Sequence, residues 1–110
     1  MKVKFYETSA GKSPVLEFVE RLPVDIRSDF FDAVLRLNQG EILSTPISKN
    51  LSNVRKGLHE LRFRDRGGAY RVIYYIKKKD AIYVLHGFKK KTQKTPQKEL
   101  RTALKRLKEV

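Results

Sequence analysis

The spacing of hydrophobic and polar residues changes along the chain, and each spacing predicts a different element. Residues 2–7 alternate between apolar and polar and predict a short strand. Apolar residues then recur at helical spacing in residues 14–21 and 23–40, and Ser13 precedes a proline, which is a typical helix start. The first 40 residues therefore predict a strand followed by two helices.

After residue 40 the helical spacing stops, and residues 41–57 are irregular and polar, which predicts a loop. Residues 58–64 alternate again, while residues 69–78 and 81–88 are rich in β-branched and aromatic side chains. These three stretches are separated by short breaks and predict an antiparallel meander with apolar central strands. Thr95-Pro96 repeats the helix-start signature before a last stretch of helical spacing.

The predicted order of elements is β-α-α-β-β-β-α, which belongs to the α+β class. We expect a small, curved antiparallel sheet of about four strands, with the two N-terminal helices packed on one face and a C-terminal helix. The first strand should join the meander at an edge or beside the last strand. A chain of 110 residues fits one domain, so we take residues 1–110 as a single unit.

Charge is distributed unevenly along this predicted fold. Residues 1–54 carry seven Lys or Arg and seven Asp or Glu, whereas residues 55–110 carry eighteen against five. The whole net charge of +13 therefore lies in the second half. A one-sided basic excess is typical of a protein that binds a polyanion, either a nucleic acid or an acidic protein; a solubilising surface usually mixes both signs.

Composition excludes several kinds of chemistry. The chain has no cysteine, hence no disulfide, thiolate or Cys-type zinc chemistry, and its two histidines lack a carboxylate cluster, so we expect no metal site and no cofactor. No Gly-rich phosphate loop of the G-x-x-x-x-G-K-[ST] or G-x-G-x-x-G type occurs. No apolar run is long enough to cross a membrane and no signal peptide is evident, so we expect a cytoplasmic protein without membrane contact.

Basic residues converge on the predicted free face of the sheet. Arg62 and Arg64 share one face of their strand, and Arg71 lies on the next strand in the meander. Four lysines follow where the third strand leaves the sheet: Lys89, Lys90, Lys91 and Lys94. Neighbouring strands lie ~4.8 Å apart, so side chains from all three can reach one phosphate. RNA cleavage by the internal 2′-hydroxyl needs alignment, charge stabilisation and proton transfer but no metal, and a lysine crowded by cations can assist because its pKa is lowered.

Each candidate also has a purely structural interpretation. Arg71 lies in a central strand, where a charge needs a reason, and this favours function. Arg62 and Arg64 are equally well explained as solvated residues, and Tyr75 either stacks on a base or packs. His86 lies within an apolar strand, where a histidine is more often structural than catalytic.

Three segments together resemble the RelE/ParE toxin superfamily, and most closely its HigB-like, phage-derived branch. They are "PVLEFVERLP", "LHELRFRDRGGAYRVIYYI" and "AIYVLHGFKKKTQKTPQKEL", which span nearly the whole chain. The resemblance implies the toxin of a type II toxin–antitoxin pair that enters the ribosomal 30S A site and cuts mRNA by metal-independent 2′-hydroxyl attack. It also implies a helix-turn-helix antitoxin, whose complex with the toxin binds operator DNA.

By position, the resemblance makes Arg71 the arginine that contacts the scissile phosphate. It places Lys90 or Lys91 where related enzymes have a further catalytic arginine, and Arg62 and Arg64 where they have basic residues. RelE-like enzymes often carry a tyrosine or histidine beyond this point, but "TQKTPQKEL" has neither, so Lys94 is a candidate by location only.

Two other functions stay open at this point. ParE-like members of the same superfamily poison DNA gyrase and do not cut RNA, and a fold alone does not decide between such activities. A non-catalytic module that binds RNA or the ribosome would also explain the basic face. The converging cations, with Arg71 in a central strand, favour the endoribonuclease.

Overall fold

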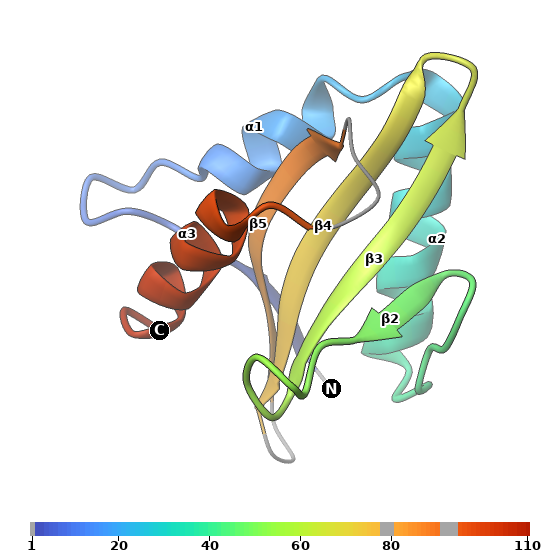
Figure 1. Cartoon of the computed structure of the whole chain (residues 1–110). Coiled ribbons are helices and arrows are strands. Elements are labelled where there is room, and N and C mark those ends of the chain that lie inside the picture. Colours follow the sequence, from blue (N-terminus) through green and yellow to red (C-terminus); the bar gives the residue numbers. More distant parts are fainter. Residues whose placement is uncertain (1, 78–80, 91–94) are drawn as a thin grey trace.

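The computed structural model describes residues 2–77, 81–90 and 95–110. The elements follow one another as a strand, two helices, four strands and a final helix (Figure 1). Their bounds are β1 Lys2–Phe5, α1 Pro14–Glu20, α2 Val24–Asn38, β2 Ser48–Asn50, β3 Leu58–Asp65, β4 Gly68–Lys77, β5 Ala81–Lys90 and α3 Gln97–Leu107. This confirms the α+β class and the predicted order, apart from one additional strand.

The strands form one five-stranded sheet in the order β1-β5-β4-β3-β2. The meander of β3, β4 and β5 is antiparallel as predicted, and β2 pairs antiparallel with β3. β1 was expected at an edge of the sheet or beside the last strand of the meander. It lies at the edge beside β5, and it runs parallel to β5. The expectation of about four strands, all antiparallel, is therefore corrected: the short strand β2 was missed within residues 41–57, and the sheet is mixed.

Helices cover both faces of the sheet. α1 packs against β5, and α2 packs against β3 and β1, behind the sheet in Figure 1. α3 packs against β5 from the front. Neighbouring residues of β5 show the same division, because Gly87 faces α1 whereas His86 is hydrogen-bonded to α3. The sheet face that we expected to be free is thus partly covered by α3, and among the described elements none packs over β3, β4 and the end of β5 on this face.

The core lies between the sheet and the pair α1 and α2. Phe30 of α2 and Tyr74 of β4 are fully buried in it, and the Tyr74 hydroxyl shares a 2.7 Å hydrogen bond with Ser48 of β2. Gly87 lets α1 approach the sheet closely, since a Cβ at this position would overlap the Phe18 ring. This packing positions β4 and β5, and with them the side chains on their other face.

The helix ends follow local sequence signals in two of three cases. Ser13 caps α1 as predicted, its Oγ accepting a 3.3 Å hydrogen bond from the Leu16 amide. α2 ends at Asn38 with Gln39 at the C-cap, and the next residue, Gly40, has a φ of 87°, a backbone conformation that favours glycine. The Thr95 cap was wrong: Pro96 occupies the cap position of α3, and the Thr95 hydroxyl binds the sheet instead.

Candidate active site

A buried carboxylate, Glu60 of β3, lies at the centre of the site. Its side chain is 0% exposed. Oε1 lies 3.4 Å from Nε of Arg62 and 3.8 Å from Nε of Arg71, and Oε2 accepts a 2.7 Å hydrogen bond from the Thr95 hydroxyl. A carboxylate out of water is tolerated only with such partners, so Glu60 holds the surrounding cations in place.

Arg71 faces Glu60 from the neighbouring strand β4. It lies directly opposite Arg62 in the β3–β4 register, which places both side chains on the same face. Arg71 is only 9% exposed, and its Nε is buried without a hydrogen-bond partner among the described residues. Burial lowers the pKa of Arg71, an effect that Glu60 opposes and Arg62 and Arg64 reinforce, but a guanidinium remains charged in proteins. The site therefore contains a buried positive charge with a donor to spare.

Lys90 completes the cluster from the end of β5. It lies opposite Ala69, two residues along from the Arg71–Phe88 pair, and so on the face of Arg71. Its exposure is 6%. Burial is the main cause that lowers the pKa of Lys90, followed by the charge of Arg71, while Glu60 acts in the opposite direction. Three cations, Arg62, Arg71 and Lys90, thus surround the single carboxylate of Glu60. We name the three cations together with Glu60 the cation cluster.

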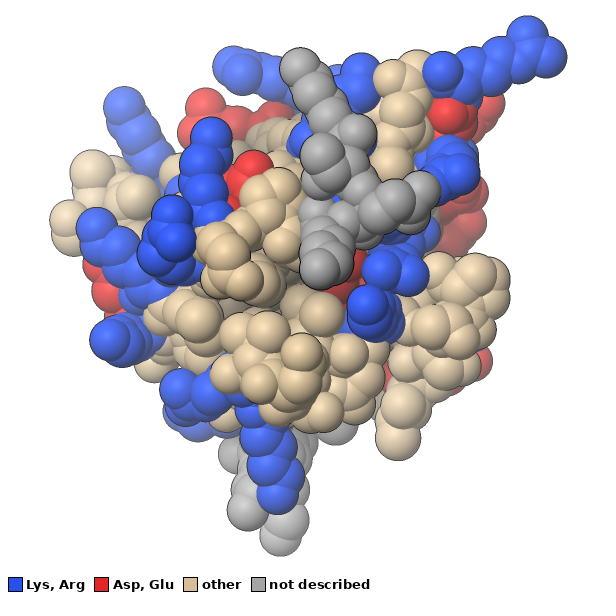
Figure 2. All heavy atoms as spheres, in the orientation of Figure 1, with Lys and Arg blue, Asp and Glu red and all other residues tan. Residues whose placement is uncertain are grey.

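Two further basic residues flank the cation cluster. Arg64 is exposed on the same face of β3, opposite Ala69. Lys49 of β2 lies opposite Glu60, and its charge is among those that lower the pKa of Lys90. Lys49 was not among the predicted site residues, because it lies in the short strand that the irregular residues 41–57 conceal. Lysines and arginines are spread over this side of the molecule in Figure 2.

His86 lies on the same sheet face but is held by α3. Its Nε2 lies 2.8 Å from Glu99 Oε1, and its Nδ1 lies 3.2 Å from Nη1 of Arg106. A guanidinium can only donate, so Nδ1 accepts and the proton of the neutral ring is on Nε2, directed at Glu99. Burial lowers the pKa of His86, partly offset by Glu99. The ring also lies nearly parallel to Phe88, at a 5.7 Å centroid distance. These contacts occupy both ring nitrogens in anchoring the helix.

The remaining predicted residues lie elsewhere. Lys89 still belongs to β5, not to a turn, and it points to the opposite face, where its Nζ is 5.6 Å from the Tyr70 ring centroid. Tyr75 is four residues along β4 from Arg71, roughly 13 Å at ~3.3 Å per residue, and lies opposite Tyr83. Lys91 and Lys94 lie outside the described residues. The structure brings together Arg62, Arg71 and Lys90 with Arg64 beside them, and it separates Lys89 and Tyr75 from this group.

The cation cluster has the chemistry of a phosphate site. Arginine offers a planar pair of donors that matches two phosphoryl oxygens, and lysine adds a mobile point charge. Within the described ranges, no group of three or more His, Cys, Asp or Glu side chains is arranged to hold a metal ion. Over the same ranges, no helix is long and apolar enough to cross a membrane.

The protein thus combines a small α+β fold with three cationic side chains gathered around one buried carboxylate. A model of the family described as "Phage derived protein Gp49-like (DUF891)" matches residues 17–108, most of the chain. The chain therefore belongs to this family of phage-derived proteins, a type II toxin family related to RelE-like toxins. Membership implies an antitoxin as partner. No curated protein matches the chain significantly.

Proposed function

We propose that this chain is a HigB-like, ribosome-dependent mRNA endoribonuclease that cleaves by attack of the 2′-hydroxyl without a metal. One observation carries the proposal: Arg71 is only 9% exposed beside Glu60, while its Nε lacks a hydrogen-bond partner in the described residues. A buried polar group without a partner is costly, and a phosphoryl oxygen would supply the missing acceptor.

In the proposed reaction, the RNA 2′-oxygen forms a bond to the adjacent phosphorus, and the bond from phosphorus to the 5′-oxygen of the next nucleotide breaks. The products are a 2′,3′-cyclic phosphate and a 5′-hydroxyl. Arg71 and Arg62 stabilise the charge that develops on the non-bridging oxygens, which is the largest task in such a transfer. Glu60 does not react; it orients both guanidinium groups through its Oε1.

Lysines move the two protons in this proposal. Lys90 has a lowered pKa, so a larger fraction of it is neutral at a given pH and able to accept the 2′-hydroxyl proton. A protonated lysine of the following segment, Lys91 or Lys94, donates to the departing 5′-oxygen. Their proximity in the sequence to Lys90 supports this assignment.

The wider basic surface serves binding. Arg64 is exposed next to the cation cluster and suits a neighbouring phosphate of the mRNA or of the 30S A site. We extend the proposal to a helix-turn-helix antitoxin that binds operator DNA in complex with the toxin, and to action in the cytoplasm. His86, Tyr75 and Lys89 have smaller roles in RNA contact, since His86 is engaged with α3 and the other two lie away from the cluster.

Primer extension on mRNA in a translating extract tests the function. The native chain should give cuts in phase with codons, and Arg71→Ala should abolish them while its circular dichroism spectrum stays unchanged. Arg21→Ala removes an exposed arginine outside the site and is the matched control. Gyrase-trapped DNA breaks without RNA cuts would show a ParE-like activity instead, and binding to ribosomes without either kind of break would show a binding module.

A further inference from the structure

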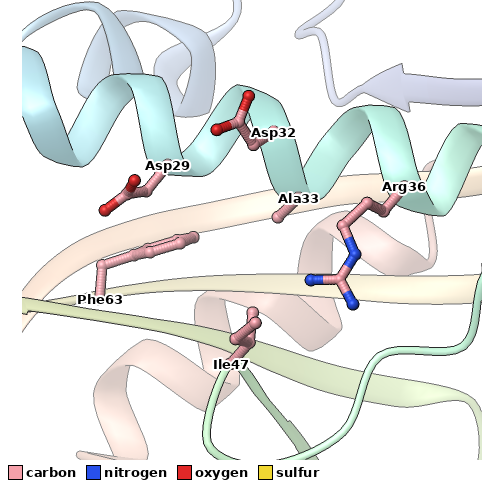
Figure 3. A pocket seen from close by; sticks show the side chains of 6 residues that line it. All are labelled: Asp29, Asp32, Ala33, Arg36, Ile47 and Phe63. Atoms are coloured by element: carbon pink, nitrogen blue, oxygen red, sulfur yellow. The ribbon is translucent and has the colours of Figure 1, made fainter.

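A cavity lies on the opposite side of the sheet from the cation cluster, between α2 and the β3 edge. Its volume is about 260 Å³. Figure 3 shows the side chains of Phe63, Ala33 and Ile47 turned toward this space, with two aspartates and Arg36 from α2 around it. An apolar cavity of ~150 Å³ holds a benzene ring, so this one is large enough for a leucine or phenylalanine side chain.

The rim of this cavity is acidic, although the protein as a whole carries +13. Asp29 and Asp32 are exposed and neighbours on α2, and neither carboxylate makes a hydrogen bond or ion pair with another described residue. Arg36 does not neutralise them, because its guanidinium is bound to Glu41 through contacts of 2.6 and 3.2 Å. The rim therefore favours a cationic group next to the apolar one.

The backbone edge beside the cavity is open. β2 covers β3 only as far as Leu61, followed by one hydrogen bond of 2.8 Å from the Arg62 amide to the Ile47 carbonyl. Since the backbone groups of a strand alternate between its two neighbours, the Arg64 amide turns to the same outer edge, beyond the reach of β2. A strand added there would place the residue opposite Phe63 on the Phe63 side of the sheet, over the cavity.

We infer that this cavity docks an extended segment of the cognate antitoxin that pairs with β3 at Arg64. The segment inserts one large apolar side chain against Phe63 and Ala33, and a nearby lysine or arginine pairs with Asp29 and Asp32. The inference rests on the antitoxin partner of the proposed function. A second copy of this chain is a poor occupant, because two proteins of +13 repel each other.

The test uses the full chain and the antitoxin, selected from the source genome as the protein whose co-expression restores growth. Asp29→Arg combined with Asp32→Arg should raise the dissociation constant of the complex with the antitoxin roughly 30-fold or more, since attractive charge pairs at the interface become repulsive. Asp25→Arg reverses an exposed carboxylate on the same helix but outside the cavity, and it should change binding less than threefold. Calorimetry of each purified variant measures the constants.

Two further measurements keep the inference open to refutation. Ala33→Leu fills the cavity without changing charge and should weaken binding at least tenfold, and hydrogen exchange should show the Arg64 amide protected only in the complex. Unchanged affinity in both the charge and the cavity variants would overturn the docking site. So would a failure of every protein of the genome to neutralise the toxin, or a dimer of the toxin alone that Ala33→Leu dissolves.

The same variants separate this inference from the proposed function. If Arg71→Ala still cuts mRNA while the double aspartate variant loses the antitoxin, the catalytic proposal fails and the docking site stands. If Arg71→Ala abolishes cleavage while the double aspartate variant binds the antitoxin normally, the reverse holds.

Discussion

The hydroxyl of Thr95 donates a 2.7 Å hydrogen bond to Oε2 of Glu60, which joins the segment before α3 to strand β3 of the sheet. Glu60 in turn lies beside Arg62 and Arg71 through its other oxygen. The start of α3 is therefore part of the structure that orients the proposed catalytic arginines.

Thr95→Val should weaken this link without changing the shape of the side chain. The buried Glu60 oxygen loses its donor, so the free energy of unfolding should fall by about 1–3 kcal/mol. Urea denaturation measures this change. Thr102→Val is the control, because the Thr102 hydroxyl bonds only to an exposed backbone carbonyl of the same helix. A loss of the same size in both variants would contradict a special role for Thr95.

Glu60→Gln should destabilise the domain and lower cleavage together. The substitution leaves the buried guanidinium of Arg71 without its counter-charge, and breaking a buried ion pair on one side costs roughly 3–5 kcal/mol. Adding Arg71→Met should recover most of the stability but none of the cleavage. Thermal unfolding and primer extension on the two variants check this. Recovery of cleavage in the double variant would show that Arg71 only balances the charge of Glu60.

Cleavage should depend on pH through Lys90. Its pKa is lowered, chiefly by burial and then by Arg71, so its neutral fraction and the rate should rise with pH below the usual lysine range of ~10.4. Single-turnover cleavage of an RNA oligonucleotide on stalled ribosomes measures the profile. Lys90→Arg keeps the charge and should flatten this rise. An identical rise in Lys90→Arg would rule out Lys90 as the proton acceptor.

Stability should fall on acidification because of His86. Its pKa is lower in the folded chain than the ordinary ~6.5, mainly through burial, so the unfolded chain binds more protons between these two values. The free energy of unfolding should therefore be constant above pH ~6.5 and decrease as the pH falls through the folded pKa. His86→Gln removes the titrating group. The melting temperature of this variant should change less than that of the native chain between about pH 7.5 and about pH 5.5, roughly one unit either side of ~6.5.

Ribosome binding should weaken steeply with salt. Each phosphate contact releases counterions, with a slope near −0.7 per contact for single-stranded RNA. Arg64→Ala removes an exposed contact next to the cation cluster and should reduce the slope by about one contact. Filter binding at salt concentrations between about 50 and about 200 mM measures this slope for the native chain and the variant. A salt-independent affinity would contradict binding of the ribosome through the cation cluster and Arg64.

Much of the site could be predicted because β strands carry a simple rule. The alternation of residues 58–64 places Glu60 and Arg62 on one face, and the short break after them pairs Arg62 with Arg71. Central strands also have apolar residues on both faces, so the charge of Arg71 was conspicuous. These features depend on neighbours in the sequence and on one hairpin.

The rest depends on contacts between distant residues. Consecutive lysines show no alternation of apolar and polar residues that would assign each one to a face of the strand. The sequence therefore does not reveal that Lys90 is on the face of Arg71 while Lys89 points to the opposite face. The three residues of β2 form a strand only because β3 offers an edge, which hid Lys49. Thr95 has a strong local preference for capping, but a buried carboxylate from 35 residues earlier takes its hydroxyl instead.

The pairing of β1 with β5 also sets an order for synthesis. These neighbours are about 80 positions apart in the chain, and at ~5–20 residues per second the partner of β1 is made roughly 4–16 s after it. Lys90 and Thr95 are made later still, so the cation cluster cannot assemble on a half-made chain. α2 and its acidic rim are complete long before. The site is therefore assembled only at a late stage of synthesis, when Lys90 and Thr95 join the residues of β3 and β4 that precede them.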